Sequence, residues 1–357
     1  MKRRVMLGMS GGVDSSAAAL LLQKTGYEVT GVTLRLRPPC LASGGTGGDP
    51  QLSDIEDARR VCGRLGIEHR VMDLTERFEQ AVIAPFAALY EAGRTPNPCV
   101  LCNPAIKFGA MLDRAEQMGF DYIATGHYAR IEQTPQGRWL LKKSPAAKDQ
   151  SYVLYGLSQR QLARTLLPIG GYAKPEIRAL AEAAGLAVAR KKDSQEICFV
   201  DDNDYAAFLE RYTGHPAQPG DFLDAAGNVI GRHRGVTHYT VGQRKGLGVS
   251  FGRPMYVTGI DAEHNTVTLG EERERYASEL TAGDLNFIPF DTLESEREAQ
   301  VKVRYSASPT KANLIPLPAG RVRVVFETPQ KSVAPGQAAV FYDGDTVLGG
   351  GTILSKE

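Results

Sequence analysis

The sequence predicts an α/β domain built on a parallel sheet, followed by a small β-rich linking domain and a C-terminal β-barrel. Over the first 130 residues, apolar strand-like runs alternate with helical patterns, and such a succession forms a parallel sheet covered on both faces. From about Asp221 onward, short β-rich runs alternate with Gly, Asp and Asn turns, which is typical of all-β domains. Boundaries are expected near residues 205 and 282, which gives domains at 1–205, 206–281 and 282–357.

The strands and helices of the first domain follow from their apolar patterns and their end signals. The strands are expected at Val5–Met9, Val29–Leu36, Arg70–Leu74 and Tyr122–Thr125. The helices are expected at Ser15–Lys24, Ser53–Leu65, Ala105–Met118, Arg160–Leu167 and Pro175–Ala184. Ligands of parallel sheets bind beyond the carboxyl ends of the strands. The segments after strands one, two and four should therefore open onto one crevice: Ser10–Ser15, Leu34–Arg37 and Gly126-His127.

Composition limits the class of protein. The 357 residues are enough for two or three domains, each with its own core. No apolar run is long enough to span a bilayer, and the first residues lack the pattern of a signal peptide, so we expect a cytoplasmic protein without membrane contact. The net charge of +1 does not by itself indicate a nucleic-acid binder. A monomer is the default expectation for such a chain.

The segment Ser10-Gly11-Gly12-Val13-Asp14-Ser15 directly follows the first apolar strand. A glycine pair and a helix start turn several unpaired N–H groups and a helix N-terminus toward one position, which favours an anion such as phosphate. No Gly-Lys-Ser/Thr follows, so the segment differs from the lysine-bearing loop of ordinary kinases and GTPases. The alternative interpretation is a glycine-rich turn with no ligand.

The segment Thr95–Pro104 contains three prolines together with Cys99 and Cys102. Because proline fixes φ and removes a hydrogen-bond donor, we expect a stiff loop and not a helix interior. Asn103 and the proline after it suit the cap and the first position of the next helix. Cys102 should then lie just outside the positive end of that helix and near Lys107, where the thiolate is favoured. We expect Cys102 to be the more reactive cysteine of the pair.

The five cysteines also allow other interpretations. An odd number in an apparently cytosolic chain argues against a disulfide framework and for reactive or metal-bound thiols. A zinc site would need two further ligands, from Cys198, Cys40 or His127. An iron–sulfur cluster held by Cys99, Cys102 and Cys198 is another alternative, and so is simple burial of the thiols.

The Ser10–Ser15 segment resembles the pyrophosphate loop of the N-type ATP pyrophosphatases, in which ATP cleavage leaves pyrophosphate and AMP goes onto an oxygen of the substrate. Six blocks together resemble the tRNA-specific 2-thiouridylases: Gly8–Ser15, Thr95–Phe108, Ala124–Arg130, Lys148–Tyr152, Lys192–Val200 and Tyr239–Leu247. Two shorter matches lie at Val303-Arg304-Tyr305 and Ala334–Ala338. The blocks run in order over nearly the whole chain. The resemblance implies an adenine nucleotide alpha hydrolase-like first domain.

The resemblance also implies roles for particular residues. An ATP site is implied at Gly8, Met9, Ser10, Gly11, Gly12, Val13, Asp14, Ser15, Leu34 and Gly126. Cys102 resembles the family's nucleophile, and Cys198 resembles the cysteine that carries a persulfide. Contacts with tRNA are implied at Asn97, Pro98, Cys99, His127, Lys148, Asp149, Gln150, Arg304, Tyr305 and Gln337. Two positions depart from the common pattern, because many members have methionine in place of Leu34 and aspartate in place of Cys99.

The implied reaction is 2-thiolation of a wobble uridine in the tRNAs for Lys, Glu and Gln. ATP would convert the C2 oxygen into an adenylate with release of pyrophosphate. Sulfur from Cys198 would then replace AMP, either as a persulfide or as sulfide released when Cys102 attacks the persulfide. Both routes end with a Cys102–Cys198 disulfide that a reductant must open. Magnesium would bridge the ATP phosphates, with Asp14 as a candidate outer ligand. A cysteine desulfurase or a sulfur-relay protein would load the persulfide.

Two rival functions stay open. A small-molecule adenylating synthetase would use the same loop, but it has no need of the cysteine segment or of a terminal β-domain. A redox or metal-binding RNA adaptor would have no need of the Ser10–Ser15 loop. Binding of tRNA predicts that folding gathers the scattered basic clusters into one groove. These clusters lie at residues 142–148, 190–192, 232–234, 244–245 and 321–323.

Overall fold

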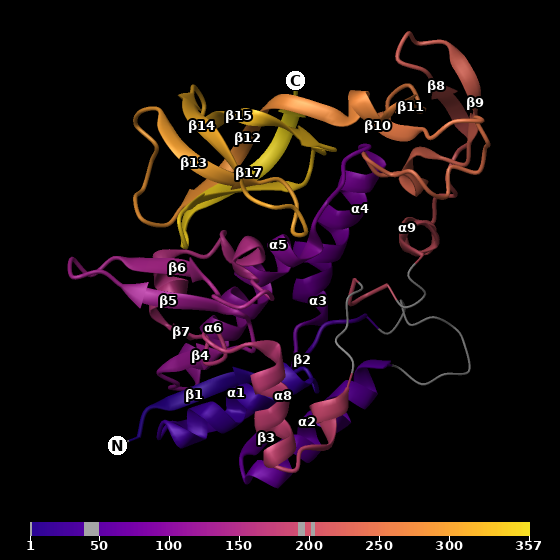
Figure 1. Ribbon diagram of the computed structural model, residues 1–357. Coiled ribbons are helices and arrows are strands. Elements are labelled where there is room, and N and C mark those ends of the chain that lie inside the picture. Colours follow the sequence, from indigo (N-terminus) through magenta and orange to yellow (C-terminus); the bar gives the residue numbers. More distant parts are fainter. Residues whose placement is uncertain (1, 39–49, 192–196, 201–203) are drawn as a thin grey trace. The chain divides into compact units, whose positions relative to one another are not determined.

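The computed structural model of the protein describes residues 2–38, 50–191, 197–200 and 204–357 (Figure 1). Contacts between residues divide the chain into two compact units. The first unit comprises Met1–Val82, Cys99–Phe199 and Asp345–Val347. The second unit comprises Ile83–Pro98, Val200–Gly344 and Leu348–Glu357. Each unit is therefore assembled from segments that are far apart in the sequence.

The first unit contains a five-stranded parallel sheet with the strand order β3-β2-β1-β4-β7. Its strands are β1 (Arg4–Gly8), β2 (Glu28–Arg35), β3 (Glu68–Asp73), β4 (Tyr122–Ala124) and β7 (Thr165–Leu166). The first four confirm the strands expected from the apolar runs. Leu7 of β1 pairs with Gly31 of β2 and with Ala124 of β4, so the carboxyl ends of these three strands lie at one edge.

The fifth strand, β7, lies within the segment where the sequence predicted a helix, Arg160–Leu167. That prediction is wrong in its second half, because helix α7 spans only Gln159–Ala163. β7 pairs instead with Ile123 and Ala124 of β4. Pairing with an existing sheet here outweighs the helical propensity of a short segment, as tertiary context commonly does.

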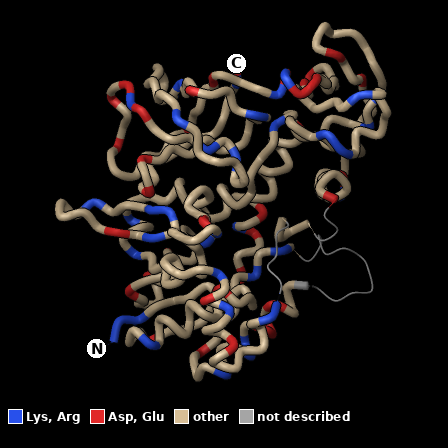
Figure 2. Tube along the Cα trace, in the orientation of Figure 1, with Lys and Arg blue, Asp and Glu red and all other residues tan. Residues whose placement is uncertain are grey.

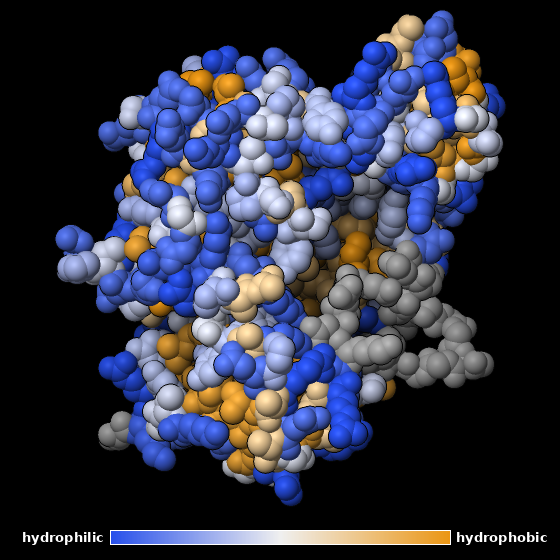
Figure 3. Space-filling view, in the orientation of Figure 1, coloured by the Kyte–Doolittle hydropathy of each residue, from blue (hydrophilic) through white to orange (hydrophobic). Residues whose placement is uncertain are grey.

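Three helices pack on this sheet, and a fourth packs on the first of them. They are α1 (Val13–Lys24), α2 (Pro50–Leu65), α6 (Met111–Gln117) and, against α1, α8 (Lys174–Ala183). Ala17, Ala18 and Ala19 of α1 are fully buried, and their small side chains let this helix approach its neighbours closely. Figure 3 shows apolar side chains gathered over α1 and α8, where Leu20 and Leu180 are partly buried against the core.

The proline-rich cysteine segment is not the loop that the sequence predicted. α5 (Pro98–Cys102), the π-helical segment η3 (Asn103–Ala110) and α6 form one continuous helical run. Pro104 lies inside this run and has no N–H to donate to the preceding turn, and a wider π-helical turn accommodates such a gap. The helix therefore begins at Pro98, a position that proline favours, and not at Asn103.

Shorter elements complete the first unit. They are α3 (Thr75–Phe78), η2 (Glu79–Ile83), η4 (Ser151–Leu154), η5 (Ala187–Arg190) and the hairpin of β5 (Ala129–Gln133) and β6 (Trp139–Lys143). The hairpin is tied to the short segment from the end of the chain, because the Arg130 guanidinium forms an ion pair with Asp345 at 2.7 Å. Thr346 also pairs with Lys142 of β6.

The second unit combines two helices with a four-stranded sheet of order β10-β11-β8-β9. The elements are α4 (Ala84–Glu91), α9 (Tyr205–Thr213), β8 (Gly220–Leu223), β9 (Val229–His233), η6 (Val236–His238), β10 (Tyr256–Asp261), β11 (Thr266–Gly270) and η7 (Glu272–Arg275). Aromatic contact joins the helices, since the Tyr90 ring stacks on Tyr205 with the centroids 4.9 Å apart. Phe222 is fully buried in the core of the sheet.

A closed β-barrel completes the second unit. Its strands are β12 (Tyr276–Phe287), β13 (Arg297–Lys302), β14 (Thr310–Leu317), β15 (Arg321–Lys331), β16 (Ala338–Asp343) and β17 (Thr346–Lys356). They follow the order β12-β15-β14-β13-β16-β17, and β17 pairs again with β12, so that closure leaves no free edge. Val324, Phe341 and Ile353 are fully buried inside. The fold class expected from the sequence is confirmed. Among the described residues, no helix combines the length and apolar character needed to cross a membrane.

Candidate active site

The turn between β1 and α1 has the geometry of an anion-binding nest. Gly11 has a φ of +67°, a left-handed conformation that glycine adopts without steric cost, and Gly12 is the N-cap of α1. The Ser15 hydroxyl accepts a hydrogen bond from the Ser10 N–H at 3.3 Å and donates one to the Gly12 carbonyl at 3.1 Å. No side chain caps the N–H groups of the first turn of α1, which are therefore available to a phosphate.

Gly126 lies directly against this nest. A Cβ at this position would come within 2.8 Å of the Asp14 carbonyl carbon and of the Ser15 nitrogen, so only glycine permits the approach. Leu34 lies near the end of β2, and its carbonyl accepts a hydrogen bond from Gln51 Nε2 at 2.9 Å. The residues expected around a nucleotide thus gather at the carboxyl edge of β1, β2 and β4.

Gly126→Ala is expected to weaken ATP binding at least about tenfold, because the added methyl pushes the backbone of the nest apart. Calorimetric titration with ATP would measure the change. The matched control is Gly171→Ala in the same unit, where a Cβ would meet no atom within 4 Å. Unchanged ATP affinity in Gly126→Ala would contradict the assignment of the nest.

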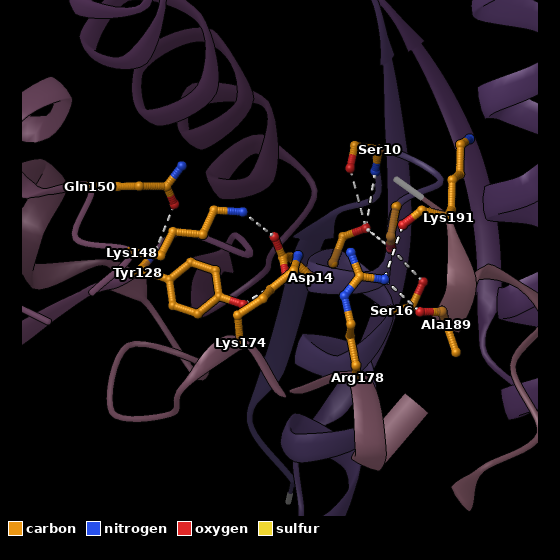
Figure 4. A network of polar contacts seen from close by, with 12 residues as sticks. Ser10, Asp14, Ser16, Tyr128, Lys148, Gln150, Lys174, Arg178, Ala189 and Lys191 are labelled. Atoms are coloured by element: carbon orange, nitrogen blue, oxygen red, sulfur yellow. Dashed lines mark hydrogen bonds and ion pairs between the residues drawn. The ribbon is translucent and has the colours of Figure 1, made fainter. Parts of the chain in front are cut away.

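Asp14, in the first turn of α1, joins three side chains from distant segments (Figure 4). Lys174 Nζ lies 2.7 Å from one carboxylate oxygen, and Lys148 Nζ lies 3.1 Å from the other. The hydroxyl of the fully buried Tyr128 donates to the first oxygen at 2.7 Å. Two ammonium groups on a single carboxylate leave an excess of positive charge beside the nest, which favours a polyanion.

A further lysine fixes the nest to α2. Lys191 Nζ lies 2.8 Å from carboxylate oxygens of both Asp54 and Asp57 and donates to the Gly11 carbonyl at 3.3 Å. Desolvation opposes the charge, but the hydrogen bonds to the two aspartates hold the pKa of Lys191 above its ordinary value. Arg178 of α8 donates to the Lys191 carbonyl at 3.1 Å, as Figure 4 shows. The conformation of the nest is therefore enforced from two helices.

In the first unit, Lys107 lies within electrostatic range of three cysteines. Desolvation alone would lower the pKa of Lys107, but Cys102, Cys99 and Cys198 outweigh it and hold that pKa above its ordinary value. Cys99 and Cys198 are exposed, whereas Cys102 is 6% exposed. The two cysteines that the resemblance singled out, and the cysteine that replaces the common aspartate, thus all influence the charge of one lysine.

The helix placement on which the expected reactivity of Cys102 was based is wrong, and its greater reactivity within the pair stays a prediction. Cys102 lies within the helical run and not outside a helix N-terminus. Burial raises the pKa of its thiol from 9.0 to about 12, and Lys107 offsets only part of that rise. Desolvation also raises the pKa of Cys198, although Lys107 and Arg37 oppose it. Cys99, in the first turn of the run, is exposed, as is Cys198.

The described ranges contain no metal site built from protein ligands. Within them, no group of three or more His, Cys, Asp or Glu side chains lies close enough to share an ion. The positions of Cys99, Cys102 and Cys198 therefore give no support to zinc or to an iron–sulfur cluster. Cys40, the other zinc ligand considered, lies outside the described residues.

His127 connects the thiols to the nest. Its ring is 9% exposed, its Nδ1 lies 2.8 Å from the Thr125 hydroxyl, and its centroid lies 5.7 Å from that of Phe108. Burial, with the charges of Lys107 and Lys148, holds the pKa of His127 well below its ordinary range, so the ring is neutral near pH 7. The lysine of the thiol cluster and a lysine bound to Asp14 thus act on the same imidazole.

The other residues of the first unit expected to contact tRNA have partners within that unit. The Gln150 side-chain oxygen accepts from the Tyr128 N–H at 2.9 Å. Asp149 accepts from the Ser151 hydroxyl at 2.8 Å and from the Ser144 N–H at 3.0 Å. Asp149 and Gln150 therefore hold the backbone near Ser144, Ser151 and Tyr128 in place.

In the second unit, the residues expected to contact tRNA differ in their hydrogen bonds within the protein and in their exposure. Arg304 donates to the Val241 carbonyl at 2.6 Å and to the Ser332 carbonyl at 2.7 Å, so its guanidinium ties two loops together. Tyr305, beside it, is 43% exposed, and Lys302 Nζ lies 5.7 Å from the centroid of its ring.

Gln337 supports the segment that precedes α5. Its side-chain amide donates to the Thr95 carbonyl at 3.0 Å and to the Pro96 carbonyl at 3.3 Å. Asn97 follows directly and is partly buried, and Pro98 begins the helix. Gln337 thereby orders the backbone from which Asn97 projects.

Several members of the basic clusters are paired with carboxylates. Lys142 lies 3.0 Å from Glu132, and Arg232 lies 3.3 Å from Asp221. Figure 2 shows Lys and Arg interspersed with Asp and Glu along both units, in keeping with the small net charge. That the clusters gather into one groove stays a prediction.

Sequence reasoning missed Lys174 and Tyr128 as partners of Asp14. The rule that ligands bind at the carboxyl edge of a parallel sheet would have pointed to Lys174, had the short strand β7 before it been recognised. Tyr128 follows Gly126 and His127 within the block quoted for the family, but no local pattern indicates that its hydroxyl turns toward Asp14.

Comparison with known proteins is consistent along the whole chain. Family models match in succession: a tRNA methyl transferase HUP domain over residues 3–202, a tRNA methyl transferase PRC-barrel domain over 206–271 and an aminomethyltransferase beta-barrel domain over 277–353. A tRNA-specific 2-thiouridylase MnmA of Acetivibrio thermocellus is 54% identical, with 99% of each chain covered. One of Heliobacterium modesticaldum is 52% identical, covering 99% of this chain and 93% of that one. A solved 4-thiouridine synthetase–RNA complex with bound ATP shares 19% identity over 53% of this chain and 43% of that one. Its TM-score of 0.33 is too low to indicate a shared fold.

Proposed function

Because the chain belongs to the tRNA-specific 2-thiouridylase family, we propose that it is an ATP-dependent sulfurtransferase that exchanges the C2 oxygen of a tRNA wobble uridine for sulfur. One observation carries the mechanism. His127 directly follows Gly126, which lies against the nest, and its ring packs on Phe108, the sequence neighbour of Lys107. A substrate bound near His127 would meet the phosphate site of the nest on one side and the thiols near Lys107 on the other.

The nest supplies the activation step. The N–H groups at Gly11–Ser15 and the start of α1 bind the phosphates of ATP, and the lysines on Asp14 add positive charge. The uridine O2 is a poor leaving group. A bond from O2 to the α-phosphorus of ATP releases pyrophosphate and makes AMP the leaving group of the next step. Asp14 is the carboxylate oxygen donor at this point, and one or two such carboxylates suffice for a magnesium ion that is otherwise held by phosphates and water. Bound there, magnesium would neutralise phosphate charge.

The thiols supply the sulfur. A persulfide on Cys198 attacks C2 of the adenylated uridine, and AMP departs with the electron pair of the broken C2–O bond. Cys102 then attacks the Cys198 sulfur, which forms the Cys102–Cys198 disulfide and leaves the second sulfur on the base. A two-electron reductant reopens the disulfide. A cysteine desulfurase or a sulfur-relay protein reloads Cys198, which is exposed and therefore accessible to such a donor.

Recognition of tRNA uses exposed and loop-borne groups. Tyr305 is open to stacking, and Asn97 to Cys99 lead into the helix that carries Cys102. We retain the wobble uridines of the Lys, Glu and Gln tRNAs as the targets, and 1–205, 206–281 and 282–357 as the functional division of the chain. The proposal implies a cytoplasmic enzyme, because its substrate is found there.

The test is to incubate the protein with unmodified tRNA, ATP, a cysteine desulfurase and cysteine, and to analyse the nucleosides by mass spectrometry. We expect 2-thiouridine to form only when ATP is present, with pyrophosphate release that requires tRNA. Pyrophosphate exchange that is indifferent to tRNA would instead favour a small-molecule synthetase. Binding of tRNA without ATP turnover would favour an adaptor, and a methylated nucleoside would indicate methyl transfer.

A further inference from the structure

The nest has no cation of its own. Ser10–Ser15 contains no lysine or arginine, whereas lysine-bearing phosphate loops bring an ammonium to the β- and γ-phosphates from within the loop. In this chain, two lysines reach the first turn of α1 from 134 and 160 residues further along. The nearer one in sequence, Lys148, was expected to contact tRNA, whereas Lys174 has been assigned no contact with ATP and only adds positive charge beside the nest.

The fold holds Lys174 at this position. Lys174 is the first residue of α8, which begins with Pro175 at its second position and with a hydrogen bond from the Ala173 N–H to Glu176 at 2.6 Å. α8 packs on α1, so the backbone of the lysine is fixed relative to the nest. The side chain is 17% exposed, and its Nζ lies 2.7 Å from Asp14. A flexible four-carbon stem lets the ammonium change partners while the backbone stays in place.

We infer that Lys174 is a phosphate-binding residue that moves from Asp14 to the β- or γ-phosphate when ATP occupies the nest. The inference rests on the proposed function only in taking ATP as the ligand. Asp14 keeps Lys148 and Tyr128 as partners when Lys174 moves, so its carboxylate is not left unpaired. The cluster of one carboxylate and two ammonium groups attracts a polyphosphate.

The inference gives Lys174 a role in the activation step. The bond from uridine O2 to the α-phosphorus forms while the bond from the α-phosphorus to the pyrophosphate oxygen breaks. The electron pair of the broken bond stays on pyrophosphate, and the uridine loses its N3 proton to solvent. An ammonium fixed at the β- or γ-phosphate stabilises the charge that develops on the leaving group. AMP has neither phosphate, so Lys174 contributes nothing to its binding.

The experiment compares ATP and AMP binding by calorimetric titration of the full chain, without tRNA. Lys174→Gln should weaken ATP binding roughly tenfold or more, because a hydrogen bond to a charged group is lost, and should leave AMP binding within about twofold. Lys174→Arg keeps the cation and should retain most of the preference for ATP. Lys24→Gln is the matched control, because Lys24 is exposed in the last turn of α1, at the end opposite the nest. Lys174→Met serves as a second neutral variant if Lys174→Gln fails to fold.

Each outcome decides the matter. ATP binding as tight as in the wild type, or an equal loss of ATP and AMP affinity, would overturn the inference, since equal loss indicates that Lys174 only positions Asp14. A wild-type protein that shows no preference for ATP over AMP would overturn it as well. If the wild type prefers ATP through Lys174 but forms no 2-thiouridine, the proposed function fails and the inference stands.

Discussion

Replacing Cys198 by serine is expected to reduce 2-thiouridine formation roughly a thousandfold or more, because a serine hydroxyl cannot carry the transferable sulfur. The activation step uses no thiol, so one round of pyrophosphate release per enzyme should persist in Cys198→Ser. Nucleoside mass spectrometry and a single-turnover pyrophosphate assay would measure the two steps separately. The pair of results distinguishes loss of the sulfur carrier from loss of the folded nest.

Cys102→Ser should likewise retain pyrophosphate release, while product release stops at the stage that requires attack on the Cys198 sulfur. The control is Cys62→Ala, since Cys62 is fully buried and is not one of the three thiols around Lys107. It should cost about 1 kcal/mol of stability or less and leave thiolation intact. Thiolation that survives in Cys198→Ser would show that another residue carries the sulfur.

Lys107→Met is expected to slow the alkylation of Cys102 and Cys198 by iodoacetamide about tenfold at a given pH, because the ammonium favours both thiolates. The direction of this effect follows because Lys107 lowers the pKa of the Cys102 thiol. With Lys107 present the pKa of Cys102 is about 12, so its alkylation rate should rise about tenfold per pH unit from pH 7 to 10. Removal of the cation raises that pKa further and moves the profile to higher pH. Peptide mass spectrometry of each cysteine over this range would record the shift.

Lys107→Arg keeps the charge and should restore most of the rate. Lys142→Met is the matched control, because Lys142 lies on the β5–β6 hairpin and pairs with Glu132 and Asp345 instead of with thiols. Equal alkylation profiles in Lys107→Met and the wild type would mean that Lys107 has no electrostatic influence on the thiols. Thiolation should fall in parallel with the rates, since the thiolate is the attacking form.

Prediction from the sequence succeeded where the signal was local. Strands β1 to β4 were correct because each is a short apolar run with a glycine or a polar segment at its end. The glycine turn that leads into α1 was correct because its glycines and the helix start are adjacent in the chain, while phosphate binding there stays a prediction. Prediction failed where a contact with a distant part of the chain outweighed the local sequence preference. Pro104 was taken as the first position of a helix, but the helical run begins at Pro98 and contains Pro104 in a π-helical turn. The segment at Thr165 looked helical, but it forms β7, which pairs with β4.

The sequence alone was sufficient for the fold class and for the glycine turn between β1 and α1, because periodicity and glycine position are properties of neighbouring residues. The roles of Cys102 and Cys198 rest on the family resemblance and stay predictions. Only the folded chain decided the partners of Asp14, the burial of Cys102 and the gathering of the thiols around Lys107. Those features join residues up to 160 positions apart, and they depend on desolvation and charge at short distance, which no local pattern encodes.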